Sequence, residues 1–260
     1  MKKTKWDRTN LGLRLLSWAI LVALFFLWQW ACVSGRVNTT ILPAPTKIWT
    51  RFLDMLKDGS LKKYMLVSLS RVMKGYLIGG GAGLILGLLL GLYRKLETVM
   101  NLYIGLLRPI PAIAWIPMLI LTFGIGETSK VAVIAIGSFW PLLLNTIEGI
   151  KGTDKALLEL GDVLEKDKKT KIFKIMLPSA IPSIFTGARL GISRAWSCVV
   201  TAEMIAASAG VGYLIQYARE LSQPALMLVG VASIGFVGLI IDYLMMKLQD
   251  KLLYWNNYNN

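Results

Sequence analysis

Histidine is absent from this 260-residue sequence, and cysteine occurs only twice. The absence of histidine excludes His-based catalytic triads, histidine metal sites and imidazole proton relays. Cys32 and Cys198 both lie inside apolar runs, which is typical of buried free thiols and not of a disulfide framework. The phosphate-binding pattern GxxxxGK[ST] is absent as well. We therefore expect no catalytic residue, no metal site and no cofactor bound by this chain.

Acidic residues are scarce. The chain has 15 Asp and Glu against 29 Lys and Arg, a formal net charge of +14. In a soluble protein this excess would suggest nucleic acid, but the sequence shows no platform of interleaved aromatic and basic residues. Basic residues also collect in cytoplasmic loops and beside anionic headgroups of membrane proteins. We therefore expect a lipid bilayer as the partner, and no nucleic acid.

Apolar residues dominate the composition, with 55% hydrophobic residues and a mean hydropathy of +0.57. Several apolar runs are about 20 residues long, enough to cross ~30 Å of hydrocarbon. Six transmembrane spans are predicted at residues 15–33, 66–93, 102–123, 131–150, 184–207 and 227–246. The predicted fold class is therefore an all-α polytopic membrane protein, with spans 2–6 forming a core domain over residues 66–250.

The positions of the basic residues predict the orientation of the chain. Residues 1–14 are basic, which places the N-terminus in the cytoplasm, and six spans then place the tail at 251–260 there too. Residues 34–65 become an outer loop, in which residues 46–58 have the spacing of an interfacial helix. One segment disagrees with the positive-inside rule, because residues 36–74 would start outside yet hold several Lys and Arg.

Glycine and proline punctuate two of the spans. The second span carries a glycine at every fourth position, which predicts a smooth face for close helix packing; these residues are Gly75, Gly79, Gly83, Gly87 and Gly91. Static packing is the favoured interpretation of this stripe, and a mobile seam is the alternative. The third span holds Pro109, Pro111 and Pro117, so its first part is expected to be kinked or irregular.

The longest polar stretch between apolar runs is at residues 151–178. Thr153 is predicted to cap a helix in which Leu157, Leu160 and Leu164 share one face. A charged segment follows, and an apolar run resumes near Pro178. This pattern indicates a short amphipathic helix in a water-facing loop between spans 4 and 5.

Several motifs together carry a family resemblance over residues 42–248. They are LPAPT at 42–46, RPIPAIAWIPMLILTFGIG at 108–126, FWPLLLNT at 139–146, LPSAIPSIFTGARLG at 177–191 and AEM at 202–204. A further part of the pattern is Glu159, followed by a long polar gap and then IMLP at 175–178. Together these motifs resemble those of permease subunits of ATP-binding-cassette importers, in the nitrate, sulfonate and taurine branch. Three positions depart from the family pattern. Leu160 and Gly161 replace the usual Ala-Ala after Glu159, and Glu165 stands where glycine is expected.

The resemblance implies a type I importer permease fold and a set of partners. These are a second permease copy, two cytoplasmic ATPase subunits that bind ATP and Mg, and an extracytoplasmic substrate-binding protein. It also implies that the amphipathic helix is a coupling helix that contacts the ATPase, through Leu157, Glu159, Leu160, Gly161 and Leu164. The alternative is that this helix lies on the bilayer or on the chain's own spans.

Charged and aromatic residues inside the spans are candidates for the substrate pathway. Ionisable groups there usually face the protein interior or a cavity; the candidates are Arg189, Arg194 and Glu203, with Trp115 and Trp196. A guanidinium offers a fork that fits oxyanions. Structural contacts are the alternative for Arg189 and Glu203, and packing is the alternative for the tryptophans.

The function predicted is therefore the translocation subunit of an importer in the cell membrane. The branch suggests a small oxyanion such as a sulfonate, taurine, nitrate or bicarbonate, and a pyrimidine-like or other ring compound is the alternative. An intramembrane enzyme is disfavoured by the lack of histidine, and the chain is not expected to be an enzyme. An ATP-independent channel would leave the amphipathic helix without a role.

Overall fold

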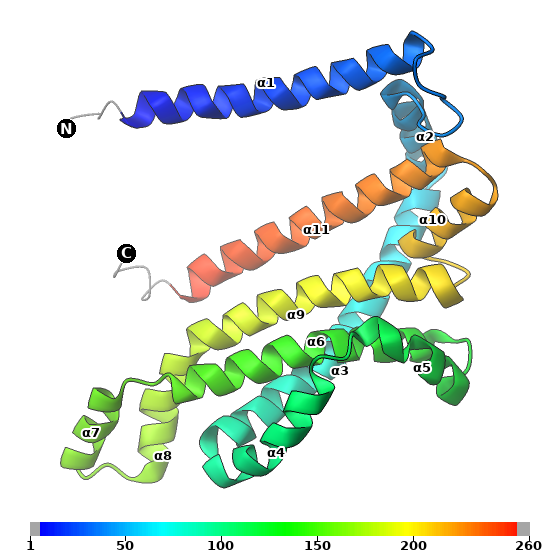
Figure 1. The fold of residues 1–260 in the computed structure, drawn as a ribbon. Helices are drawn as coiled ribbons and strands as arrows, with labels where there is room; N and C mark the ends of the chain where they lie inside the picture. Colours follow the sequence, from blue (N-terminus) through cyan, green and yellow to red (C-terminus); the bar gives the residue numbers. More distant parts are fainter. Residues whose placement is uncertain (1–5, 254–260) are drawn as a thin grey trace. The chain divides into compact units, whose positions relative to one another are not determined.

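A computed structural model describes residues 6–253, and every regular element in this range is helical (Figure 1). The chain divides into two compact units, one formed by residues 1–61 with 215–232, the other by residues 62–214 with 233–260. Parts of the predicted cytoplasmic segments 1–14 and 251–260 lie outside the described residues.

The first unit contains α1 (Trp6–Val33) and α2 (Pro45–Lys57), together with parts of α10 (Val211–Glu220) and α11 (Pro224–Leu252). Pro45 begins α2 at a position where its missing N–H would have no helical partner. The Gln29 side chain ties α1 to α2 by hydrogen bonds to the hydroxyl and the amide of Thr46, each 3.3 Å long. The predicted interfacial helix at 46–58 thus corresponds to α2.

The second unit contains the core of the protein. Its long helices are α3 (Ser60–Leu92), α6 (Glu127–Lys151), α9 (Leu177–Ala206) and the later part of α11. The shorter elements are α4 (Arg94–Leu107), η1 (Ala112–Trp115), α5 (Ile116–Phe123), α7 (Lys155–Val163), α8 (Lys168–Lys171) and the π-helical turn η2 (Ile172–Met176).

The five glycines of α3 lie against α6. A Cβ added at Gly79 would lie 2.0 Å from the Ala135 carbonyl oxygen, and one at Gly83 would lie 2.5 Å from the Phe139 oxygen. Gly75 faces Ile134, and Gly91 faces Ile150, so the contacts advance along both helices in the same direction. The two helices therefore run parallel, with their backbones in direct contact.

Helices α6 and α9 pack closely in opposite directions. Gly149, near the end of α6, faces Ala180 and Ser183, whereas Gly137, near the middle of α6, faces Cys198, which is later in α9. The main buried cluster lies along this pair and includes Val133, Ile134 and Val199, which are almost fully buried. α9 begins at Leu177, earlier than the predicted residue 184, because Pro178 falls in its first turn, where proline is accommodated.

The third predicted span is interrupted, as its prolines suggested. α4 ends at Leu107, Pro111 precedes the 3-10 turn η1, and the axes on the two sides of the break differ by 81°. Among residues 6–253, five helices are long and apolar enough to cross a membrane, and the bent pair would make a sixth span. A short loop follows α9, which ends at Ala206, and leads to α10 at Val211.

Candidate functional site

The predicted coupling segment forms a helical hairpin of α7 and α8, which connects the last residues of α6 to the first residues of α9 (Figure 1). The helix cap differs from the prediction by one residue. Asp154 caps α7 by accepting a hydrogen bond from the Ala156 N–H at 2.9 Å, while the Thr153 hydroxyl donates to the Ile150 carbonyl instead. Thr153 is buried at the end of α6 and therefore belongs to that helix end.

One face of α7 is uncovered by the chain. Leu157, Leu160 and Leu164 are 45%, 53% and 56% exposed. Gly161, one helical turn after Leu157, is buried, and a Cβ added there would lie 3.2 Å from the side chains of Lys171 and Ile175 in the second arm of the hairpin. Glu159 is exposed. The hairpin thus closes on itself through Gly161 and leaves its leucines outside.

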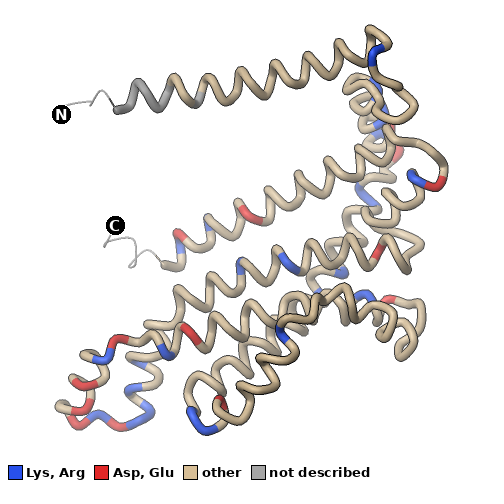
Figure 2. Tube along the Cα trace, viewed as in Figure 1, with Lys and Arg blue, Asp and Glu red and all other residues tan. Residues whose placement is uncertain are grey.

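Ion pairs and tight turns brace the hairpin, where charged residues of both signs crowd together (Figure 2). Lys171 forms an ion pair with Asp162 across the two arms. The Thr170 hydroxyl donates a hydrogen bond to Asp167, which lowers the pKa of that carboxyl below its usual value. Glu165 adopts a left-handed φ of 52°, and the next N–H, of Lys166, donates to the Gly161 carbonyl at 2.9 Å. This geometry favours the glycine that the family pattern expects there.

A cluster of buried charged residues links several helices of the second unit. Its central residue, Arg71, was not singled out from the sequence. Arg71 donates to Glu203 at 2.8 Å and contacts both carboxylate oxygens of Glu127, at 2.6 and 2.7 Å. The Arg71 side chain is 5% exposed and that of Glu203 is 0% exposed. Arg71 also donates to the carbonyl of Ala209. One guanidinium thus joins α3, α6, α9 and the loop before α10.

The Glu203 carboxylate has a full set of donors. Ser68 donates its hydroxyl hydrogen at 2.8 Å and the Gly212 N–H donates at 2.9 Å, in addition to Arg71. The loop at Gly210 closes over it so tightly that an added Cβ there would lie 2.3 Å from the carboxylate carbon. In this conformation Glu203 holds the end of α9 and is not open to a solute.

Two further pathway candidates are also engaged in structural contacts. Arg189 makes a double hydrogen bond to Asp242 on α11, at 2.8 and 3.0 Å. Trp196 is buried in the core and donates its indole N–H to the Ile234 carbonyl at 3.1 Å. Both residues therefore attach α9 to α11.

Arg194 is the exception among the charged candidates. It is exposed, and its guanidinium has no ion-pair or hydrogen-bond partner among the described residues. The same face of α9 carries the exposed residues Thr186, Ser193 and Ser197, spaced as one helical stripe. The hydroxyls of Thr186 and Ser197 donate to the carbonyls four residues earlier, which satisfies them within the helix. A polar stripe on a spanning helix is unsuited to lipid.

Trp115 lines an apolar pocket of about 440 Å³ in the second unit. Helices α3, α4 and α6 form its walls, and its aromatic lining includes Tyr103, Phe139 and Trp140. The break between α4 and α5 brings Trp115 to this position, so the pocket depends on the irregular third span.

Comparison with known proteins agrees with this architecture. The family described as "Binding-protein-dependent transport system inner membrane component" matches residues 79–253. The chain belongs to this family. It is 37% identical over 239 residues to the putative aliphatic sulfonates transport permease protein SsuC of Bacillus subtilis, covering 92% of this chain and 86% of that protein. A putative ABC transporter permease protein of Methanocaldococcus jannaschii is 40% identical over 224 residues, covering 86% and 81%.

Other permeases extend the comparison. The bicarbonate transport system permease protein CmpB of Synechococcus elongatus is 31% identical over 261 residues, covering 96% of this permease and 92% of its own length. Among solved structures, a chain of an amino acid ABC transporter is similar in fold, with a TM-score of 0.65 and 16% identity, covering 77% of this permease and 98% of that chain. The resemblance to importer permeases inferred from the sequence motifs is therefore confirmed, together with the all-α membrane fold.

Proposed function

We propose that this permease forms the translocation pathway of an ATP-driven importer as one half of a homodimer. Two cytoplasmic ATPase subunits bind ATP and Mg and supply the work, and a separate binding protein delivers the solute at the outer face. The chain itself catalyses no reaction. Both termini then lie in the cytoplasm of a cell that holds the complex in its plasma or inner membrane. The uncovered leucine face of α7 carries the proposal.

The exposed leucines of α7 suit a docking surface on the ATPase. Each leucine would contribute roughly 1.5–3 kcal/mol if fully buried against a partner. The hairpin is fastened internally by Gly161 and the Lys171–Asp162 ion pair, so a displacement of α7 is passed to the ends of α6 and α9. ATP-driven closure of two ATPases would then rock the spans between inward-open and outward-open states.

Substitution of the central leucine tests this coupling. We expect Leu160→Asp to abolish ATP-dependent uptake in proteoliposomes that contain permease, ATPase and binding protein, because a buried carboxylate at the interface is costly. Lys155→Asp is the matched control, since it places the same group on the opposite, exposed side of α7. Normal uptake by the Leu160→Asp complex would refute the docking role.

Arg194 is the proposed solute contact in the pathway. Its unpaired guanidinium and the adjacent hydroxyl stripe require a polar environment, which a water-filled pathway between two permease copies provides. Trp115, in the apolar pocket, is a second proposed lining residue. We expect Arg194→Ala to lose anion uptake while the complex still assembles, and Arg194→Lys to retain part of it. Unchanged uptake kinetics in Arg194→Ala would exclude this role.

The solute is proposed to be a small oxyanion. Relatives named for aliphatic sulfonates and for bicarbonate support this class, and a guanidinium matches the geometry of such groups. A ring compound such as a pyrimidine is the alternative. The ligand that raises the melting temperature of the cognate binding protein distinguishes the two: stabilisation by sulfonates or bicarbonate supports the proposal, and stabilisation by a neutral ring compound contradicts it.

A further inference from the structure

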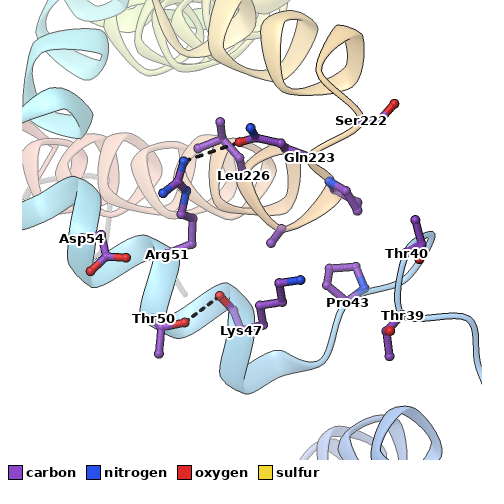
Figure 3. Close-up of a pocket in the computed structure, with 12 residues that line it drawn as sticks. Thr39, Thr40, Pro43, Lys47, Thr50, Arg51, Asp54, Ser222, Gln223 and Leu226 are labelled. Carbon is purple, nitrogen blue, oxygen red and sulfur yellow. Dashed lines mark hydrogen bonds between the residues drawn. The ribbon is translucent and has the colours of Figure 1, made fainter. Parts of the chain in front are cut away.

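The basic residues of the outer segment line a pocket that the transport mechanism above does not use. It lies within the first unit, has a volume of about 480 Å³, and is bounded by the turn after α1, by α2, and by the start of α11 (Figure 3). Lys47 and Arg51 are one helical turn apart on α2 and line the same wall.

Neither cation of this wall forms an ion pair among the described residues, although Asp58, at the end of α2, attracts Arg51 electrostatically. Within the described part of the chain, Arg51 donates one side-chain hydrogen bond, from Nη2 to the neutral amide oxygen of Gln223 at 3.4 Å, which leaves its other N–H groups available. Lys47 has no side-chain partner among the described residues. Asp54 is the acidic residue of the lining, and no ion pair within the described residues joins it to either cation. In Figure 3 a dashed line joins Arg51 to Gln223, and none joins Asp54 to either cation.

The remaining lining suits a small organic anion. Pro43, Ala225 and Leu226 are buried apolar residues of the lining. Thr39 and Thr40 are exposed and add hydroxyl groups to it. The volume falls in the range of small-molecule sites, roughly 300–1,000 Å³. Cationic donors and apolar side chains in one lining favour a ligand that has a charged oxygen-rich head and a short apolar part.

We infer that this pocket binds an oxyanion group of the sulfate, sulfonate or phosphate class, held by Lys47 and Arg51. Two sources share this chemistry, a free anion and the phosphate of an anionic phospholipid. Trp49, on the same helix, is 61% exposed and stacks on Phe52, as an interfacial aromatic pair would. The position of the pocket at the outer face rests on the proposed function, but binding itself does not require transport.

This site also gives a physical reason for the basic outer segment. Positive charge outside opposes the usual distribution of Lys and Arg. An anion pocket at the outer surface would need Lys47 and Arg51 there, and charge of this sign would raise the local concentration of anions.

Anion binding to the purified full-length permease in neutral detergent tests the inference. The probes are sodium sulfate and methanesulfonate, with sodium chloride at equal ionic strength, and the readout is the melting temperature together with equilibrium dialysis of labelled sulfate. The test variant is Lys47→Gln with Arg51→Gln. The matched control is Lys57→Gln, which removes a cation from the same helix outside the pocket. A parallel arm compares nanodiscs of phosphatidylglycerol with nanodiscs of phosphatidylcholine.

We expect sulfate or methanesulfonate to stabilise the wild type beyond chloride, and binding to weaken about tenfold or more in the double variant but not in Lys57→Gln. Stabilisation by phosphatidylglycerol alone, lost in the double variant, would identify the lipid phosphate as the source. Stabilisation by neither probe overturns the inference. A double variant that binds sulfate normally but loses affinity for the binding protein would also overturn it, because a protein contact would then explain the charges. None of these outcomes depends on uptake, so they leave the proposed function to its own tests.

Discussion

At the scale of single residues, Arg71 shows how a charge can be kept inside a membrane helix. Two carboxylates, Glu127 and Glu203, face its guanidinium from different helices. Glu203 is wholly buried, whereas the Glu127 side chain is 61% exposed at the start of α6. The loss of Arg71 would therefore leave one carboxylate buried without its counterion and the other in contact with water.

Replacement of Arg71 is predicted to destabilise the core strongly. We expect Arg71→Met to cost about 3–5 kcal/mol of folding free energy, because it strands the Glu203 charge. Thermal unfolding of the purified permease in detergent measures the effect, with Lys74→Met as control, since Lys74 is exposed on the same helix. Arg71→Met combined with Glu203→Gln should unfold less readily than Arg71→Met alone. Equal stability of Arg71→Met and Lys74→Met would show that the cluster contributes little.

The turn after the coupling helix yields a gain-of-stability prediction. Glu165 holds a φ of 52°, which is unfavourable for any residue with a Cβ. We expect Glu165→Gly to stabilise the hairpin by about 1 kcal/mol. Hydrogen exchange of the Lys166 amide, which donates to Gly161, reports the local opening. Glu165→Ala keeps the Cβ and removes the same charge, so slower exchange there as well would attribute the gain to charge and not to backbone strain.

From the sequence, ionisable residues inside the spans could be identified, but the residues with which they pair could not. Glu203 and Arg189 stood out as ionisable groups inside spans. Arg71 lay inside the predicted second span, at 66–93, and the same rule could have found it. The partners Ser68, Glu127 and Asp242 come from distant parts of the chain. Only the fold brings them together, so no local pattern could pair them.

At the scale of elements, the glycine stripe of α3 was visible as a four-residue repeat, but its partner was not. The repeat predicts that another helix can approach α3 closely. That α6 is this helix, and that it runs parallel to α3, depends on the register of Ile134, Ala135 and Phe139 against the glycines. α10 escaped prediction because its short amphipathic sequence follows a glycine-rich loop without a long apolar run.

Alanine substitutions along α3 test whether a glycine matters because it contacts α6. We expect Gly79→Ala to destabilise the permease by about 1–3 kcal/mol, because the new methyl group would meet the backbone of Ala135, which cannot rotate away. Gly81 has no atom within 4 Å of an added Cβ, so Gly81→Ala should be tolerated. The measurement is thermal unfolding in detergent. If both variants behave alike, the stripe does not form the close contact with α6.

At the scale of the whole molecule, the parallel course of α3 and α6 constrains the third span. Arg71, in the first half of α3, meets Glu127 at the start of α6, and Glu97, just after α3, pairs with Lys151 at the end of α6 at 2.8 Å. Two parallel spanning helices both begin on one side of the membrane. The connection through α4, η1 and α5 must therefore return across the full bilayer, and a re-entrant loop that comes back to its own side would not suffice.

The bent pair is thus predicted to cross the membrane as one broken span, which gives six spans and both termini on one side. In a background without Cys32 and Cys198, single cysteines are introduced as Lys95→Cys, Ile125→Cys and Glu159→Cys, and a membrane-impermeant maleimide is applied to intact cells. Ile125→Cys should react from outside, because Ile125 is 79% exposed in the turn before α6. Lys95→Cys and Glu159→Cys should react only after permeabilisation.

Labelling of Lys95→Cys and Ile125→Cys from the same side would mean that the pair is re-entrant, and the importer topology would then have to be rebuilt on five spans. Labelling of Glu159→Cys from outside would remove the coupling helix from reach of any cytoplasmic ATPase.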